Sequence, residues 1–281
     1  MIGRRCAVLA AVALALGVQS SATASTSFSS SAAVRWLNQL REANGLPGTV
    51  TENPAWSAKC LRHIRWMERN RTLRHDETPG SPGFSTAGEW AGANAVLAEQ
   101  TDWTANRLPW LTAPIHLAQL LAPELTEVGV AFEHGWAYAT TWPGFASPRG
   151  HAALYAFPAD GTRDVPTGMV ASERPFGPGQ FVGIPAGSRT GPYLYVYAVG
   201  DWLAGLPHVV SASLQDSAGR SVAVRHVDAT TREIGAYLPP ASGMVIPVRP
   251  LAAATAYTAS VTFGNGEERE TLHWRFQTAA Q

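Results

Sequence analysis

The sequence predicts an α+β protein of two domains, a mixed helix-and-strand domain followed by an all-β domain. Apolar residues recur at helical spacing in the first half of the chain, beyond its first 30 residues. Short alternating strand patterns separated by turn residues fill the second half. With 46% apolar and 15% charged residues, the composition suits packed cores and not disorder.

The first 24 residues have the order of a secretory signal peptide. Arg4 and Arg5 form a short positive region, and an apolar run follows over residues 7–18. Residues 22–24, Ala-Thr-Ala, then offer a small-residue cleavage site. The apolar run falls short of the roughly 20 residues that span a bilayer. We therefore expect a secreted, extracellular protein with no transmembrane segment after cleavage.

Two helices are predicted next. The first begins near Ser31 and ends at Asn44-Gly45. The second begins at Asn53-Pro54, where asparagine can cap the helix and proline fits its first turn. Cys60, the one cysteine left after cleavage, falls on the apolar stripe of this helix and is predicted to be a small buried residue.

The remainder of the first domain reads as loop, short helices and a strand pair. Residues 75–92 are predicted to form a long structured loop, followed by a short helix over 94–99. Residues 103–111 look helical up to Pro109, and Pro114 opens a further helix. Two strands, 128–132 and 136–142, are predicted to pair around a turn.

The domain boundary is predicted between residues 158 and 165, where turn residues gather, so the domains span 31–158 and 165–281. Beyond it, residues 193–198 alternate in strand fashion. Residues 257–263 and 272–276 each place large apolar side chains on one strand face and are separated by a glycine turn. This spacing favours a β-sandwich.

Standard catalytic motifs are absent from the sequence. It contains no HExxH, CxxC or GxSxG pattern and no phosphate-binding loop. Formal net charge is zero and no basic stripe is visible, so nucleic acid is not an expected partner.

Histidines with acids nearby are the remaining candidates for a site. His75 opens the long loop beside Glu77, Glu89 closes that loop, and His116 lies at a predicted helix start. If His75 and His116 converge, two imidazoles and one carboxylate could hold a divalent metal such as zinc. The same groups could act as general acid and base. Hydrogen-bonded structural histidines are the competing interpretation, which spacing alone favours.

The order of these features resembles the CAP superfamily of cysteine-rich secretory, antigen 5 and pathogenesis-related proteins, in its bacterial, cysteine-poor branch. The resemblance rests on the helix that starts at Asn53-Pro54, on His75, on the Pro-Ile-His stretch at 114–116 and on Glu-Val-Gly-Val at 127–130. It implies an α-β-α sandwich with a surface cleft that carries two histidines, here His75 and His116. The family's usual glutamate is replaced in the Gly-Ala-Asn segment at 92–94, so Glu89 or Glu77 would have to substitute for it.

The second half resembles bacterial immunoglobulin-like modules through its Tyr257-Thr258 and Trp274-x-Phe276 strands. Three functions remain open on this basis. The first is a non-enzymatic secreted protein that binds a small apolar or lipid-like ligand, or an envelope protein. The second is a metal-dependent hydrolase or peptidase, and the third is a structural or adhesive envelope protein.

Overall fold

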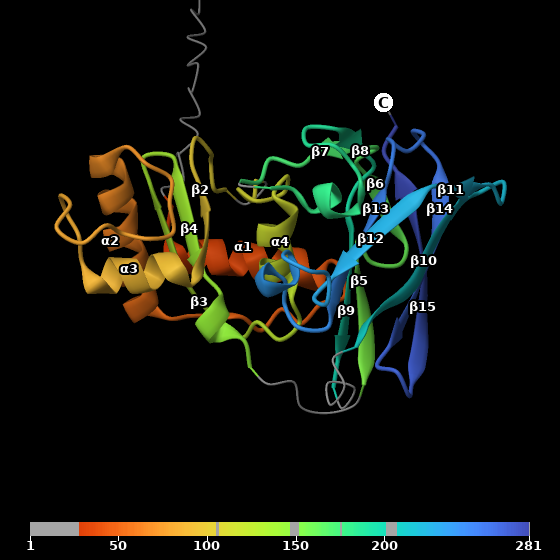
Figure 1. The fold of residues 1–281 in the computed structure, drawn as a ribbon, viewed down its shortest axis with the longest axis horizontal. Coiled ribbons are helices and arrows are strands. Elements are labelled where there is room, and N and C mark those ends of the chain that lie inside the picture. The colour runs from red at the N-terminus through yellow and green to blue at the C-terminus, as the bar shows by residue number, and fades with distance from the viewer. Residues whose placement is uncertain (1–27, 105–106, 147–151, 175, 201–206, 281) are drawn as a thin grey trace, which may run out of the picture.

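The structure is a computed structural model that describes residues 28–104, 107–146, 152–174, 176–200 and 207–280 (Figure 1). The predicted signal peptide, residues 1–24, lies outside the described residues. None of the described helices combines the length and apolar character needed to cross a bilayer.

Two units follow one another along the chain. The elements of the first are α1 (Ser30–Glu42), β1 (Thr51–Glu52), α2 (Pro54–Asn70), α3 (Thr86–Ala93), β2 (Ala95–Ala98), α4 (Pro114–Leu121), β3 (Glu127–Glu133), β4 (Trp136–Thr140) and η1 (Trp142–Gly144). The described elements of the second are β5 (Ala153–Phe157), β6 (Thr162–Val165), β7 (Met169–Val170), η2 (Pro178–Val182), β8 (Arg189–Thr190), β9 (Leu194–Val199), β10 (His208–Asp216), β11 (Ser221–Val222), β12 (Val224–Asp228), η4 (Gly235–Tyr237), β13 (Ser242–Pro247), β14 (Ala256–Gly264) and β15 (Arg269–Thr278).

The first unit is a sheet covered by helices on both faces, which fits an α-β-α sandwich. Its strand order is β1-β3-β4-β2. The period-2 alternation of β4 sends Tyr138 toward α2 and α3, and Ala137 and Ala139 toward α1 and α4. Figure 1 shows the sheet between these helices.

Helix α2 begins as the sequence predicts. The Asn53 side chain accepts a hydrogen bond from the Trp56 amide at 3.1 Å, and Pro54 occupies the first turn. The helix ends at Asn70 and is capped by Arg71, which adopts a left-handed conformation with φ 49°. Cys60 is fully buried on the inner face, which confirms its prediction as a small buried residue.

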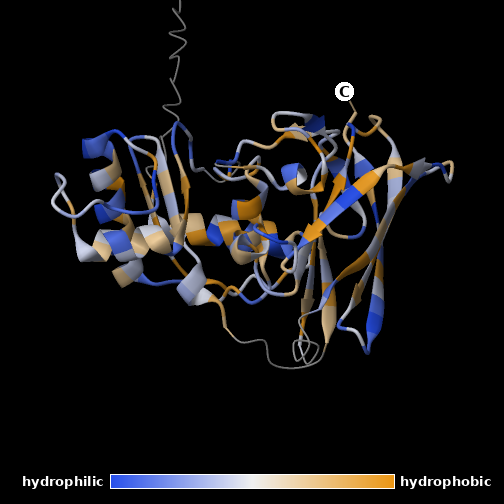
Figure 2. Ribbon diagram, viewed as in Figure 1, coloured by the Kyte–Doolittle hydropathy of each residue, from blue (hydrophilic) through white to orange (hydrophobic). Residues whose placement is uncertain are grey.

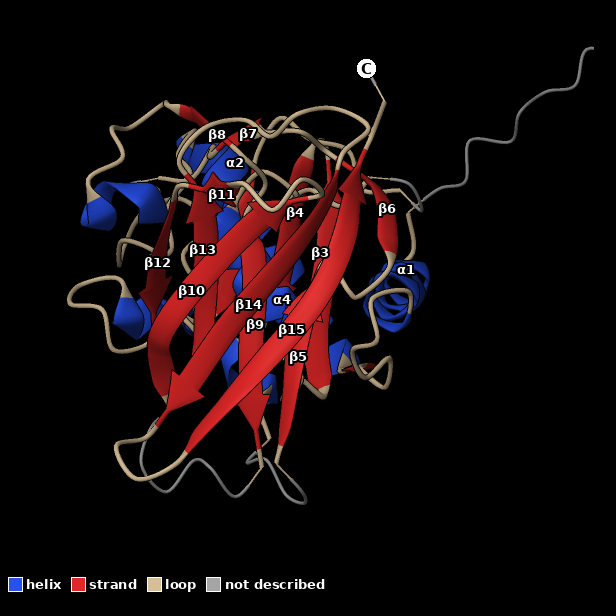
Figure 3. Ribbon diagram, turned by 90° about the vertical axis from the view of Figure 1, so that its right-hand side faces the viewer, coloured by secondary structure: helices blue, strands red, loops and turns tan. Residues whose placement is uncertain are grey.

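The second unit consists mainly of two sheets packed face to face. One has the order β11-β10-β14-β15-β6 and the other β12-β13-β9-β5, and Figure 3 shows the first lying in front of the second. The inward side chains of β14 and β15, including Val261, Phe263, Trp274 and Phe276, meet those of β9 in one core. The predicted strand faces at 257–263 and 272–276 therefore point inward.

Strand β5 shows that the predicted domain boundary was placed too late in the sequence. The sequence places residues 153–157 in the first domain, but they pair with β9 in the second unit, with Tyr155 opposite Tyr197. The turn residues after 157 connect β5 to β6 within the second unit and do not separate the two units.

Helix α4 joins the two units. Leu120 packs into the core of the first unit, whereas Leu117 and Leu121 pack with Tyr195 and Tyr197 of β9. An eight-residue helix that is apolar on nearly all sides is expected to be buried on all sides. Figure 2 shows apolar colouring where α4 lies between the two units.

Three local predictions in the first unit are wrong. Residues 95–98 form strand β2, which pairs with β4, where a helix over 94–99 was expected. Residues 103–111 hold turns and an isolated bridge between Thr104 and Arg107, without a helix among the described residues. The segment 75–92 contains helix α3 and is not a loop throughout. Alanine and leucine favour a helix intrinsically, so pairing with β4 overrides that propensity in β2.

Candidate functional site

Two imidazoles from distant parts of the chain lie side by side at the edge of α4. His75 follows α2, and His116 sits in the first turn of α4. Their ring centroids are 6.5 Å apart and their planes are inclined by 26°. The structure therefore brings together the two histidines that the sequence singled out.

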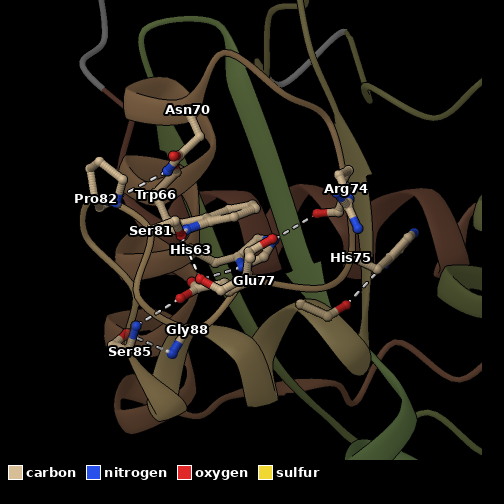
Figure 4. Close-up of polar contacts among 12 residues, drawn as sticks. His63, Trp66, Asn70, Arg74, His75, Glu77, Ser81, Pro82, Ser85 and Gly88 are labelled. Carbon is tan, nitrogen blue, oxygen red and sulfur yellow. Dashed lines mark hydrogen bonds and ion pairs between the residues drawn. The ribbon is translucent and has the colours of Figure 1, made fainter.

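Each of these rings is held through its Nδ1 atom. His75 Nδ1 lies 2.9 Å from the Gly92 carbonyl oxygen, which can only accept, so His75 donates there (Figure 4). His116 Nδ1 lies 2.9 Å from Glu173 Oε1, and the same oxygen accepts the His116 backbone N–H at 2.9 Å. Both rings thus carry a proton on Nδ1, and a neutral ring leaves a lone pair on Nε2.

Burial keeps His75 in its neutral form. Desolvation lowers the pKa of its imidazole, and the neighbouring His116 ring lowers it further, while the bond to Gly92 opposes the change. At neutral pH the Nε2 atom of His75 is therefore a hydrogen-bond acceptor or a potential metal ligand.

Both histidines line a surface cleft of about 690 Å³. The lining combines apolar and polar side chains, and it includes segment 172–174 of the second unit. Leu73 and Leu111 at the cleft are 39% and 44% exposed, which places them among the most exposed large apolar side chains of the described residues. The other apolar lining residues are Leu97, Ala98, Leu108, Pro109, Trp110 and Ala113.

Glu77 does not face this cleft, contrary to its prediction as a cleft residue. It is 2% exposed, and its Oε1 lies 3.0 Å from His63 Nδ1 while its Oε2 accepts the Ser85 amide at 2.8 Å. His63 Nε2 lies 2.8 Å from the Arg74 carbonyl, so a neutral His63 could not donate on both sides (Figure 4). His63 therefore donates from Nε2 to Arg74, and one further proton lies between its Nδ1 atom and Glu77 Oε1 in a buried pair.

The buried pair of His63 and Glu77 was missed because His63 has no acid close to it along α2. Its role is structural, since it fixes the chain on both sides of His75 through Arg74 and Glu77. Gly92 lies against the same pair, because a Cβ built on Gly92 would come within 2.6 Å of the His63 ring. The pair and the close packing of Gly92 together hold the carbonyl that anchors His75.

Glu89 also lies outside the cleft. It is half-buried in the first turn of α3, and it makes no side-chain hydrogen bond within the described part of the chain. The carboxylate beside the histidines is instead Glu173, from the second unit. Glu173 is separated from His116 by 57 residues, and no motif in the sequence marks it.

The donor set does not fit a metal site with three protein ligands. Among the described residues, no group of three or more His, Cys, Asp or Glu side chains is arranged to hold a metal ion. Glu173 is bonded to His116 Nδ1, so it orients the ring and is not itself a third metal ligand. Catalytic zinc sites keep three protein ligands, and here two imidazoles remain.

Comparison with known proteins bears on the first unit. No curated protein matches this chain. Residues 34–142 match the family model described as CAP, the Cysteine-rich secretory protein family, and this range runs from α1 to the first residue of η1. The match supports the presence of a CAP-superfamily domain in the first unit of this chain.

Proposed function

We propose that this chain is a secreted, non-enzymatic CAP-like protein that binds a small amphipathic, lipid-like molecule in the cleft at His75 and His116. The observation that supports it most is the cleft of about 690 Å³, which combines exposed apolar side chains with two imidazoles. Ligand pockets typically have such a volume and pair an apolar lining with a few placed polar groups.

The polar end of the cleft favours a hydroxyl head group. Both rings are bonded through Nδ1, so in the neutral form of either ring Nε2 accepts a hydrogen bond and does not donate one. A hydroxyl donates, as in a monoacylglycerol, whereas an ionised fatty acid does not. Arg174, which is exposed at the cleft, would instead favour the carboxylate of a fatty acid. Binding of a monoacylglycerol should therefore be compared with binding of a fatty acid.

The proposal extends to export and to the second unit. The leader at residues 1–24 supports secretion, and N-terminal sequencing of protein from the medium should begin at Ser25. The two packed sheets support an immunoglobulin-like assignment of the second unit.

The rival hydrolase function would need a third metal ligand, and neither Glu89 nor Glu77 lines the cleft.

The test is titration of the purified protein with a fluorescently labelled monoacylglycerol, with a labelled fatty acid as comparator. We expect saturable binding of the monoacylglycerol and at least tenfold weaker binding after Leu111→Asp, because a charge at the cleft opposes contact with the acyl chain. Val210→Asp is the matched control, since Val210 is 36% exposed and does not line the cleft.

Two results would contradict this function. One is the absence of saturable binding of either lipid by wild-type protein. The other is an equal loss in the Leu111 and Val210 variants, which would mark non-specific surface adsorption. Retention of an envelope protein by wild type, with loss in the Leu111 variant and no lipid binding, would favour a protein partner instead.

A further inference from the structure

The cleft is built by both units of the chain. Segment 172–174 leaves the small β7-β8 ribbon of the second unit and runs against the start of α4. The Ser172 amide donates to the Thr112 carbonyl at 2.8 Å, and the Ser172 hydroxyl donates to the same oxygen at 3.0 Å. These bonds tie the segment to the turn that precedes His116.

Glu173 is the buried centre of this contact. Its side chain is 1% exposed, although it belongs to a loop. Its Oε1 accepts from two donors of one residue, the backbone N–H and the Nδ1–H of His116. Its Oε2 is buried without a partner among the described residues. A buried carboxylate that is only partly satisfied is costly, so such a group needs a reason to be there.

We propose that Glu173 is a positioning residue of the cleft, supplied by the second unit, which fixes His116 with its Nε2 atom available to the ligand. The second unit is then part of the binding site and not a spacer. This inference rests on the proposed function for the identity of the ligand, while the orientation of His116 can be tested without any ligand.

Three observations support this role. His116 lines the cleft with its side chain 17% exposed, while its Nδ1 atom is bonded to Glu173. His75 is anchored in the same way, through Nδ1, by the Gly92 carbonyl. The two rings lie nearly parallel at 6.5 Å, so both anchors together present two acceptors to one ligand head group.

The experiment uses the mature full chain labelled with ¹⁵N-histidine and long-range ¹H–¹⁵N spectra at pH 8. In the wild type we expect His75 and His116 to carry the proton on Nδ1. Glu173→Ala should release His116 toward the Nε2–H tautomer and leave His75 unchanged. The same variant should bind the labelled monoacylglycerol at least tenfold more weakly.

Matched variants separate positioning from general damage. Glu173→Gln keeps an acceptor oxygen in place, so we expect it to retain the His116 tautomer. Glu173→Asp withdraws the oxygen by one methylene and should act like alanine, which keeps the test available if the alanine variant does not fold. Glu89→Ala removes a carboxylate outside the cleft and should change neither readout.

The outcomes are distinct for the two proposals. If His116 keeps its Nδ1 proton in both Glu173→Ala and Glu173→Asp, the positioning role is overturned. If its tautomer changes but lipid affinity does not, the contribution of Glu173 to the binding site is overturned. If the tautomer changes and wild-type protein binds neither lipid, the positioning role stands and the proposed function fails.

Discussion

Several ionisable side chains of this protein lie out of water, and each has a specific partner. Glu77 meets His63, Glu173 meets His116, and the thiol of Cys60 lies 3.1 Å from the Thr140 hydroxyl. Burial raises the pKa of the Cys60 thiol to about 12, so this cysteine is not a nucleophile at neutral pH. These pairings explain why acids near histidines in sequence were a poor guide to acids near histidines in space.

The sequence could point to His75 and His116 because histidine binds metals and transfers protons, and because one opens a long loop and the other lies at a predicted helix start. It could not nominate Glu173, because the contact depends on how a loop of one unit docks against a helix of the other. It misassigned Glu77 for a different reason, because the partner of Glu77 is His63, which lies 14 residues earlier on the inner face of α2 within the same unit.

Glu124 gives a pH-dependent prediction at this scale. Burial raises the pKa of its carboxyl from 4.5 to about 7, against an opposing effect of Arg41. The folded state therefore binds this proton more tightly than the unfolded state, and the free energy of unfolding should fall as pH rises from about 4.5 to about 7. Glu124→Gln should remove a cost of roughly 2–3 kcal/mol at pH 8, allowing for partial exposure, and none at pH 4.

Urea unfolding of wild type and variant at pH 4 and pH 8 measures this difference. Glu267→Gln, on the exposed hairpin between β14 and β15, is the control and should show no such dependence. An equal effect of Glu124→Gln at both pH values would show that ionisation of Glu124 is not the cause.

At the scale of elements, local sequence signals predicted the structure correctly where the interacting residues are only a few positions apart. The starts of α2 and α4 follow from Asn53-Pro54 and from Pro114, because caps and first-turn prolines act within a few residues. Strand β2 was missed because its Ala-Val-Leu-Ala sequence has no period and its partner β4 lies about 40 residues later. The four residues of β2 are too few to show an alternating pattern that would predict its pairing with β4.

The N-cap of α2 can be tested directly. Asn53→Ala removes the acceptor for the Trp56 amide and should lower the free energy of unfolding by about 1 kcal/mol. Asn53→Ser retains a capping oxygen and should lose less. Urea denaturation of the three proteins decides the matter, and equal stability of wild type and Asn53→Ala would mean that the cap contributes nothing.

At the scale of the whole molecule, the two units share one buried contact through α4. The hydroxyl of Tyr197 in β9 donates to the Ala118 carbonyl of α4 at 3.0 Å, and Gln119 donates to the Tyr237 carbonyl at 3.0 Å. The sequence predicted both units but not this contact, since the strand pattern at 193–198 does not say what covers each face. In the structure the tyrosines of β9 face α4, and Leu194 and Val196 face the sandwich core.

Because α4 belongs to both cores, we expect the two units to unfold together in one calorimetric transition. Leu117→Ala opens a cavity in the shared contact and should destabilise the protein by roughly 2–5 kcal/mol. Ile64→Ala does the same within α2, far from the second unit, and should lower the same single transition. Two transitions in the wild type, or a shift of only one part of the melting curve in the Ile64 variant, would show that the units are independent. Independent units would in turn loosen segment 172–174 from His116, so this measurement also tests whether the cleft is a fixed feature of the folded chain.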